Sequence, residues 1–295
     1  MKTDSDRIWA DVAWLAAEPR PAESDRLEEC RRYCENQLAD AGWQVQRVAF
    51  SAEDSDAASL RGVNLVCDHS HQAADRPTFV VGAHLDSCEE TPGADDNASA
   101  VAVMLEVARL FPQLLTESES PPIANLQLVT FDLEEHGMLG GAFHAESCKA
   151  AGVDLVGMVS LEMLGYCSHQ PGSQSFPPEL ADRYPDVGNF IGVVGNQISE
   201  ALIQKFVAGF RQVPALPVEF LQVPDNGRTF PPTRLSDHSP FWDEGFPALM
   251  ITDTSFMRNP HYHQPSDTID TLDQEFLHRV AEGVLNGIRN VVFGR

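Results

Sequence analysis

The chain has 295 residues, of which 43% are hydrophobic, so it can form one large domain or two small ones with a sizeable core. Its 44 acidic residues outnumber its 20 basic residues, and the formal net charge is −24. This imbalance argues against a nucleic acid or an anionic membrane as a partner, because phosphate binding depends on clustered cations. We see no secretion signal and no segment of membrane-spanning length, so we expect a cytoplasmic protein with six reduced cysteines.

The first third of the sequence predicts two helices followed by strands. The helices are expected over residues 6–17 and 25–41, in a segment (1–43) that packs on the rest of the domain. Strands are expected over residues 44–50 and 62–67. The apolar run Phe79-Val80-Val81 predicts a third strand, which leads through a polar loop into a helix with apolar residues at helical spacing.

Strands and helices alternate along the remaining chain. Strands are expected over 125–132, 153–163, 190–194, 217–223 and 247–252, and helices over 140–150, 197–211, from 236, and over 272–292. Two irregular segments, 168–188 and 224–235, are rich in Pro and Gly and are expected near a binding site. This alternation predicts an α/β protein of one domain, a three-layer αβα sandwich around a mostly parallel mixed sheet. Its ligand site is expected at the carboxyl edge of that sheet.

Polar residues follow several of these strands. They are His84, Asp96, Glu134, Glu135, Glu162 and His263. Imidazoles and carboxylates without thiolates suit Zn²⁺ or a similar divalent ion. Since one metal needs only three protein ligands, five ligands and a spare carboxylate suggest two metals that share a bridging group. Cations would also relieve the repulsion between carboxylates buried together.

Each residue taken alone also allows a structural explanation. Glu134-Glu135 could be an exposed acidic turn, although Glu162 interrupts an apolar strand where burial of an unpaired carboxylate is costly. Cys88 and Cys167 lie near the polar motifs, but neither belongs to a C-x-x-C pair, so we do not expect thiolate ligands. The histidines expected at the surface are His69, His71, His169 and His278.

Six motifs occur in order between His84 and Thr268. They are H-L-D-S, P-G-A-D-D-N-A-S, F-D-L-E-E-H-G-M-L-G, S-L-E-M-L-G-Y, S-D-H-S-P-F and N-P-H-Y-H-Q-P-S-D-T. Together they resemble the co-catalytic zinc aminopeptidase family, which contains bacterial leucyl aminopeptidases, glutamate carboxypeptidase II and glutaminyl cyclases. The resemblance implies a zinc-dependent metallopeptidase with two Zn²⁺, or other divalent ions, that removes N-terminal residues from small peptides with a free N-terminus.

The resemblance also implies a role for each matching residue. Asp96 would bridge the two metals; His84 and Glu162 would hold one, and Glu135 and His263 the other. The general base would be Glu134. Asp86 would orient the ring of His84, and Asp237 is a weaker candidate for a similar role near His263. Glu162 stands where many members of the family have Asp, which keeps the charge but changes the reach of that ligand.

Two other functions remain open at this stage, and the substrate is not determined. A glutaminyl cyclase would use the same fold with one zinc, and a non-catalytic binding protein would have lost ligands, although no ligand position is vacant here. The substrate pocket is expected to involve Tyr166 and the two irregular segments. Arg258 and Tyr262 are candidates for contacts with polar groups of the substrate. If Arg258 faces the site, a substrate carboxylate becomes plausible. Oligomeric state is not readable from the sequence.

Overall fold

The computed structural model describes residues 2–178, 180 and 183–294. The described residues contain an eight-stranded sheet with the strand order β1-β2-β4-β3-β5-β8-β6-β7. The strands are β1 (Trp43–Glu53), β2 (Ser59–His69), β3 (Thr78–His84), β4 (Asn125–Phe131), β5 (Leu155–Glu162), β6 (Ile191–Asn196), β7 (Val218–Val223) and β8 (Ala248–Thr252). The sheet is mixed, because β2 runs antiparallel to β1 and β4, and β6 runs antiparallel to β8.

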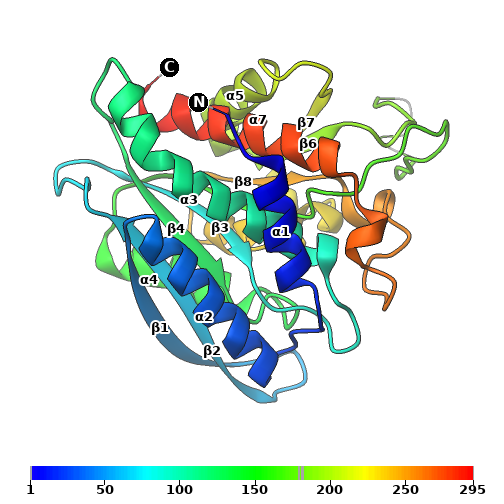
Figure 1. Ribbon diagram of the computed structural model, residues 1–295, viewed down its shortest axis with the longest axis horizontal. Helices are drawn as coiled ribbons and strands as arrows, with labels where there is room; N and C mark the ends of the chain where they lie inside the picture. Colours follow the sequence, from blue (N-terminus) through cyan, green and yellow to red (C-terminus); the bar gives the residue numbers. More distant parts are fainter. Residues whose placement is uncertain (1, 179, 181–182, 295) are drawn as a thin grey trace.

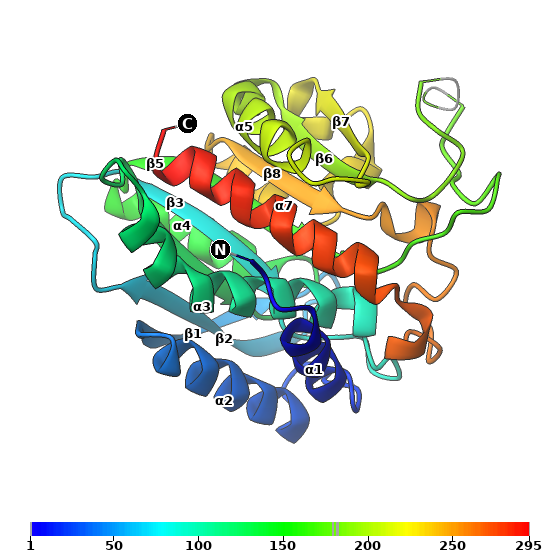
Figure 2. The ribbon, with the colours of Figure 1, turned by 45° about the horizontal axis from the view of Figure 1, so that its top comes forward.

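Helices cover both faces of this sheet (Figures 1 and 2). The helices are α1 (Ser5–Leu15), α2 (Asp25–Asp40), α3 (Ala100–Glu117), α4 (Leu139–Ala151), α5 (Glu200–Phe210), α6 (His238–Asp243) and α7 (Gln274–Val292). One face packs against α1, α2, α3, α5 and α7 through the larger apolar core, and the other packs against α4 and α6 through a smaller one. The predicted α/β class with its three layers is therefore confirmed.

The parallel strands at the centre of the sheet determine where polar residues gather. Strands β4, β3, β5 and β8 are neighbours and run in the same direction. Each is buried on both faces, which explains their almost continuous apolar sequences. Their carboxyl ends meet at one edge, so His84 at the end of β3 and Glu162 at the end of β5 lie beside the loop that follows β4.

The sequence was expected to hold no segment of membrane-spanning length, but the helical stretch that contains α3 is one. Within the described residues, the helical stretch Ala94–Glu117 is long and apolar enough to cross a membrane, but 78% of its apolar window is buried inside the fold. Val101, Met104 and Leu105 lie in the larger core, between the sheet and the outer helices. This stretch is therefore the core helix of the domain.

The first hairpin extends further than the sequence indicated. Strands β1 and β2 pair from Trp43–His69 to Glu53–Ser59, beyond the expected ends at residues 50 and 62. The expectation of a surface position for His69 is wrong. Its ring is only 7% exposed and lies edge-on against Trp43 and Phe111, at centroid distances of 5.2 and 5.3 Å. The acidic turn between the strands hid their length, because its Ser and Ala residues give no alternating pattern.

A buried histidine on α4 makes the stability of the fold sensitive to acid. His144 contacts Gln127 through Nε2 at 3.1 Å, and burial lowers its pKa from 6.5 to about 4. As pH falls, the His144 imidazole is protonated in the unfolded chain before it is protonated in the folded protein. The stability that the neutral imidazole contributes above pH 6.5 is therefore lost as pH falls towards 4. Between pH 6.5 and 4, the free energy of unfolding of the wild type is expected to fall by up to about 3 kcal/mol more than that of His144→Gln.

Urea unfolding of both proteins at several pH values measures this difference. At pH 7.5 the imidazole is neutral in both states, so the two free energies differ there only by packing. Equal dependence on pH in the two proteins would contradict the assignment.

Candidate metal centre

The carboxylate of Asp96 lies between two histidines from distant parts of the chain. Its Oδ1 is 3.1 Å from Nε2 of His84, and its Oδ2 is 3.3 Å from Nε2 of His263. The side chain of Asp96 is buried, at 4% exposure. Each oxygen therefore faces a different imidazole nitrogen, which is the arrangement expected of a carboxylate shared by two ion sites.

The first group of donors contains His84, Asp96 and Glu162, all buried. Oε1 of Glu162 is 3.5 Å from Nε2 of His84, and Oε2 accepts a 2.7 Å hydrogen bond from the hydroxyl of Ser236. Nδ1 of His84 lies 3.1 Å from the backbone oxygen of Asp86, to which it can donate. That contact leaves Nε2 as the free acceptor, and it is buried without a hydrogen-bond partner among the described residues.

The second group contains Glu135 and His263, with Asp96 on its inner side. Nε2 of His263 is 3.1 Å from Oε2 of Glu135. The thiol of Cys88 donates a 3.1 Å hydrogen bond to the same Oε2, and its sulfur, Glu135 and His263 lie within 4.8 Å of one another. Cys88 was not expected among the donors, because it lacks a neighbouring cysteine. Its proximity arises from the loop that folds back after β3.

Glu134 lies beside the first group and is partly exposed. Its Oε2 is 4.0 Å from Nε2 of His84, and its side chain is 15% exposed. The backbone N–H groups of Glu134 and Glu135 donate to Oδ1 and Oδ2 of Asp86, each at 3.2 Å. Asp86 therefore contacts His84 and also fixes the turn that carries the two glutamates.

The electrostatics of this cluster call for positive charge. Burial lowers the pKa of His84, but Glu162 and Glu134 outweigh burial and hold that pKa well above its usual value. For His263, burial is likewise outweighed by hydrogen bonding to Asp96, and the pKa rises to about 12. Burial raises the pKa of Glu134 well above its usual range, and His84 opposes this shift. Divalent cations can replace those protons, and the free Nε2 of His84 with its carboxylate neighbours fits Zn²⁺.

The loop that carries Asp96 is held by backbone hydrogen bonds to Asp267. Oδ1 and Oδ2 of Asp267 accept from the N–H groups of Asp95 and Asp96, at 3.0 and 3.1 Å. The side chain of Asp95 turns away from the centre, where it accepts from Gly165 N at 2.8 Å and from Asn259 Nδ2 at 2.7 Å. The two adjacent aspartates therefore have different roles, and Asp96, to which the resemblance assigned the bridging role, is the one that faces the two histidines.

Arg20, which no sequence motif indicated, holds the start of the same loop through hydrogen bonds to backbone carbonyl groups. Its side chain is fully buried, and its Nε and Nη2 donate to the carbonyl oxygens of Leu85 and Gly93 at 2.7 and 2.9 Å. Its Nη1 donates to the carbonyl of Pro92. These contacts join the end of β3 to the start of the Asp96 loop. An arginine in the segment between α1 and α2 carries no sequence signal for this role.

Arg20→Met is expected to destabilise the protein by at least about 3 kcal/mol, because three buried carbonyl groups lose their donors. Arg32→Met is the matched control, since Arg32 is exposed and its one ion pair among the described residues is with Glu28, at 3.1 Å on the same helix. Its loss is expected to cost less than about 1 kcal/mol. Guanidinium unfolding of the two variants measures the difference. Equal, small losses would show that Arg20 is dispensable for the loop.

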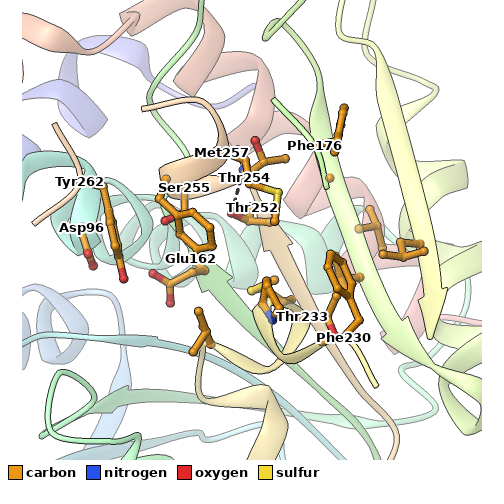
Figure 3. Close-up of a pocket in the computed structure, with 18 of the residues that line it drawn as sticks. Asp96, Glu162, Phe176, Phe230, Thr233, Thr252, Thr254, Ser255, Met257 and Tyr262 are labelled. Atoms are coloured by element: carbon orange, nitrogen blue, oxygen red, sulfur yellow. Dashed lines mark hydrogen bonds between the residues drawn. The ribbon is translucent and has the colours of Figure 1, made fainter. Parts of the chain in front are cut away.

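An apolar cavity of about 280 Å³ opens directly from this centre (Figure 3). Asp96, Glu134, Glu135 and Glu162 lie at one end. Thr252 and Met250 of β8 and residues of β6 and β7 form further parts of the lining. Both irregular segments contribute to the lining as expected, through Phe176, Leu180, Tyr184, Phe230, Pro232, Thr233 and Leu235.

Of the three candidate pocket residues, Tyr262 lines the cavity, with its ring stacked on His263 at 3.8 Å. Tyr166 and Arg258 are not among the described lining residues. Arg258 is 6% exposed; its Nε donates to Gln174 at 2.8 Å, and its guanidinium lies over Phe190 at 4.6 Å. A substrate carboxylate was expected only if Arg258 faced the site. Since Arg258 does not line the cavity, that expectation has no support.

Asp237 also lies elsewhere than expected. It is fully buried beside Gly141, where any Cβ on that glycine would come within 2.5 Å of Oδ1. Burial raises its pKa well above the usual range, with an opposing effect of His84 and a further increase from Glu162. Asp237 therefore belongs to the His84 side of the centre, rather than the His263 side.

Comparison with known sequences identifies related proteins. The family model described as Peptidase family M28 matches residues 64–288. A protein of Escherichia coli (strain K12) named "Uncharacterized protein YfbL" is 35% identical over 92% of this chain and 83% of its own length. A "Probable leucine aminopeptidase" of Trichophyton verrucosum is 25% identical over 82% of this chain. This chain spans 64% of the length of that relative.

Comparison with solved structures places the same fold in several enzymes. BSAP, a zinc aminopeptidase from Bacillus subtilis, has a TM-score of 0.75 at 14% identity, over 99% of this chain and 96% of the other. A glutaminyl cyclase of Porphyromonas gingivalis has a TM-score of 0.72 at 18% identity, over 98% of this chain and 99% of the other. At these identities the likeness concerns the fold alone.

Proposed function

The chain belongs to peptidase family M28, and from that premise we propose that it is an aminopeptidase that uses two divalent cations, most simply Zn²⁺. The observation that carries this proposal is the position of Asp96, whose two oxygens face His84 and His263 separately. His84 and Glu162 would hold one ion, Glu135 and His263 the other, and Asp96 both. When bound, such ions polarise a carbonyl group and make a water molecule more acidic.

Glu134 is the proposed general base. It lines the cavity beside both donor groups, and hydrogen bonds from its own and the next N–H group to Asp86 fix its turn. From this position its carboxylate can take a proton from the attacking water and return it to the departing amine. The groups that bind metal therefore need not exchange protons during the reaction.

The charge of the site supports an attack at the N-terminus of a peptide. Among the described lining residues there is no lysine or arginine, and four carboxylates surround the centre. Two bound divalent cations would balance these four carboxylates. The described lining then offers no cationic side chain to hold a C-terminal carboxylate, whereas a free α-amino group can donate hydrogen bonds to the carboxylates of the centre. The apolar cavity beside the centre would take the side chain of the N-terminal residue, which favours long or bulky residues over glycine and alanine.

Two alternatives use the same fold. A glutaminyl cyclase-like enzyme with one zinc would need only one donor group, whereas this chain brings together two. A non-catalytic binding protein has no use for the Glu134 carboxylate at the mouth of the centre. The positions of Glu134 and His263 therefore favour the aminopeptidase.

One experiment separates the three functions. The zinc-loaded protein is incubated with a peptide that begins with glutamine and with its N-acetylated form, and the products are identified by mass spectrometry. Release of free glutamine from the unblocked peptide alone is the expected result. A pyroglutamyl peptide of unchanged length would indicate the cyclase. No turnover of this peptide or of a broad aminoacyl panel, with metal bound, would indicate the binding protein.

A further inference from the structure

A second acidic position lies in the cavity, away from the metal centre. Glu219 on β7 lines the same cavity as Glu162. Apart from the residues of the centre, it is the one charged side chain among the described lining residues. In the described part of the chain, no hydrogen bond or ion pair is found for its carboxylate. The side chain is partly buried, and this partial burial raises the pKa of the carboxyl, so a cationic partner in the cavity would stabilise its charged form.

The pairing of the sheet places this glutamate in line with the centre. Glu162 of β5 pairs with Thr252 of β8, Thr252 with Gly192 of β6, and Gly192 with Glu219 of β7. Directly paired residues point to the same face, so Glu162 and Glu219 stand at the two ends of one row. Thr252 and Gly192 between them also line the cavity. Gly192 has no side chain, so the residue paired with Glu219 leaves space in the cavity beside the carboxylate.

The length of this row sets the size of the group that fits. Three strand spacings put the backbones of Glu162 and Glu219 about 14 Å apart. Each glutamate side chain reaches about 4 Å from its Cα, so about 6 to 14 Å separate the carboxylates, depending on how they lean. A lysine or arginine side chain extends roughly 6 to 7 Å from its Cα. An N-terminal residue held at the metal centre can therefore bring a terminal cation to Glu219.

The walls of the cavity suit the stem of such a side chain. Phe176 and Phe230 supply aromatic surface, which packs against methylene groups and attracts cations. The nearby hydroxyl groups are engaged elsewhere, since Tyr184 donates to Phe220 O at 2.9 Å and Thr233 to Phe230 O at 2.7 Å. Thr252 and Ser255 also line the cavity, but away from the metal centre Glu219 is the one group among the described lining residues whose charge matches a cation at the tip of the substrate side chain.

We propose that Glu219 is a specificity-determining residue that selects N-terminal residues with a long side chain ending in a positive charge, lysine and arginine. This inference rests on the proposed aminopeptidase function. The carboxylate accepts a charge-assisted hydrogen bond from the ammonium or guanidinium group, while the apolar walls bind the stem. The exposed guanidinium of Arg211 lowers the pKa of Glu219 from a distance. Among the described residues, Arg211 forms no ion pair with Glu219.

The test compares fluorogenic amides of lysine and norleucine, which share the same unbranched stem and differ in the terminal ammonium group. For the zinc-loaded wild type, kcat/KM is expected to be higher for lysine. Glu219→Gln is expected to lower kcat/KM for lysine by about ten- to a hundredfold, the size of a charge-assisted hydrogen bond. The value for norleucine is expected to stay within about threefold. Glu200→Gln, an equal change of net charge on the exposed surface of α5, is the matched control and is expected to leave both values unchanged.

The outcomes separate the two levels of the proposal. If both substrates are hydrolysed and Glu219→Gln lowers kcat/KM equally for both, or for neither, Glu219 does not select the charge. In that case the aminopeptidase function still stands. A fluorogenic amide of leucine is measured as a third substrate. If the wild type with bound zinc hydrolyses none of the three amides, both proposals fail. Glu219→Lys provides a second readout, because reversal of the charge should lower the lysine value below that of Glu219→Gln, and an unchanged value would overturn the selection. Circular dichroism confirms that each variant is folded.

Discussion

Glu134→Gln is expected to lower kcat for an N-terminal aminoacyl substrate by roughly 10² to 10⁴-fold, the usual contribution of a general base. The amide keeps the shape of the side chain and its place in the turn, which Asp86 holds through the backbone N–H groups of Glu134 and Glu135 at 3.2 Å. KM and the number of bound ions should therefore stay close to wild type. Steady-state kinetics together with metal analysis of the same preparation measures all three quantities.

Glu134→Asp is the companion variant. It retains a carboxylate that is one methylene shorter, so part of the lost activity should return. A glutamine variant that binds metal normally and turns over at the wild-type rate would exclude Glu134 as the base.

Asp96→Asn is expected to have the second large effect, because it weakens both ion sites at once. The amide has no charge and has only one acceptor oxygen, whereas the carboxylate presents Oδ1 to His84 at 3.1 Å and Oδ2 to His263 at 3.3 Å. Affinity for both ions should fall by at least about tenfold to a hundredfold, the range seen even for residues that only support metal ligands. Activity should fall by at least about a thousandfold at limiting zinc.

Asp95→Asn is the control next to it in the chain. The carboxyl of Asp95 hydrogen-bonds Gly165 and Asn259 and is turned away from the centre. An amide keeps only one acceptor oxygen, so one of these two donors loses its partner. This variant is expected to keep its ions and lose about 1 to 3 kcal/mol of stability. Equal losses of metal in both variants would contradict a bridging role that is specific to Asp96.

The fold and the convergence of polar residues were predictable because both depend on local patterns. Apolar strands that alternate with helices predict a parallel sheet, and parallel strands bring their carboxyl ends to one edge. His84 and Glu162 lie at the ends of strands that were readable as continuous apolar runs. Their meeting therefore follows from topology, without knowledge of any side-chain contact.

Features that depend on long-range packing were not predictable. Arg258 was a plausible substrate ligand, but Gln174 and Phe190 hold its side chain behind the cavity. Arg20 reaches the Asp96 loop across 73 positions in the chain. The row that links Glu162 to Glu219 requires the strand order, because β8 inserts between β5 and β6. In each case the partner is determined by which elements are neighbours in space.

Metal stoichiometry tests the central claim most directly. The protein is equilibrated with zinc by dialysis, and bound metal per chain is measured by mass spectrometry for the wild type, His84→Ala and His263→Ala. Two ions in the wild type and one in each variant are expected, because each histidine belongs to a different donor group around Asp96. A single ion in the wild type, or a histidine variant that still holds two, would contradict a pair of ions joined by Asp96.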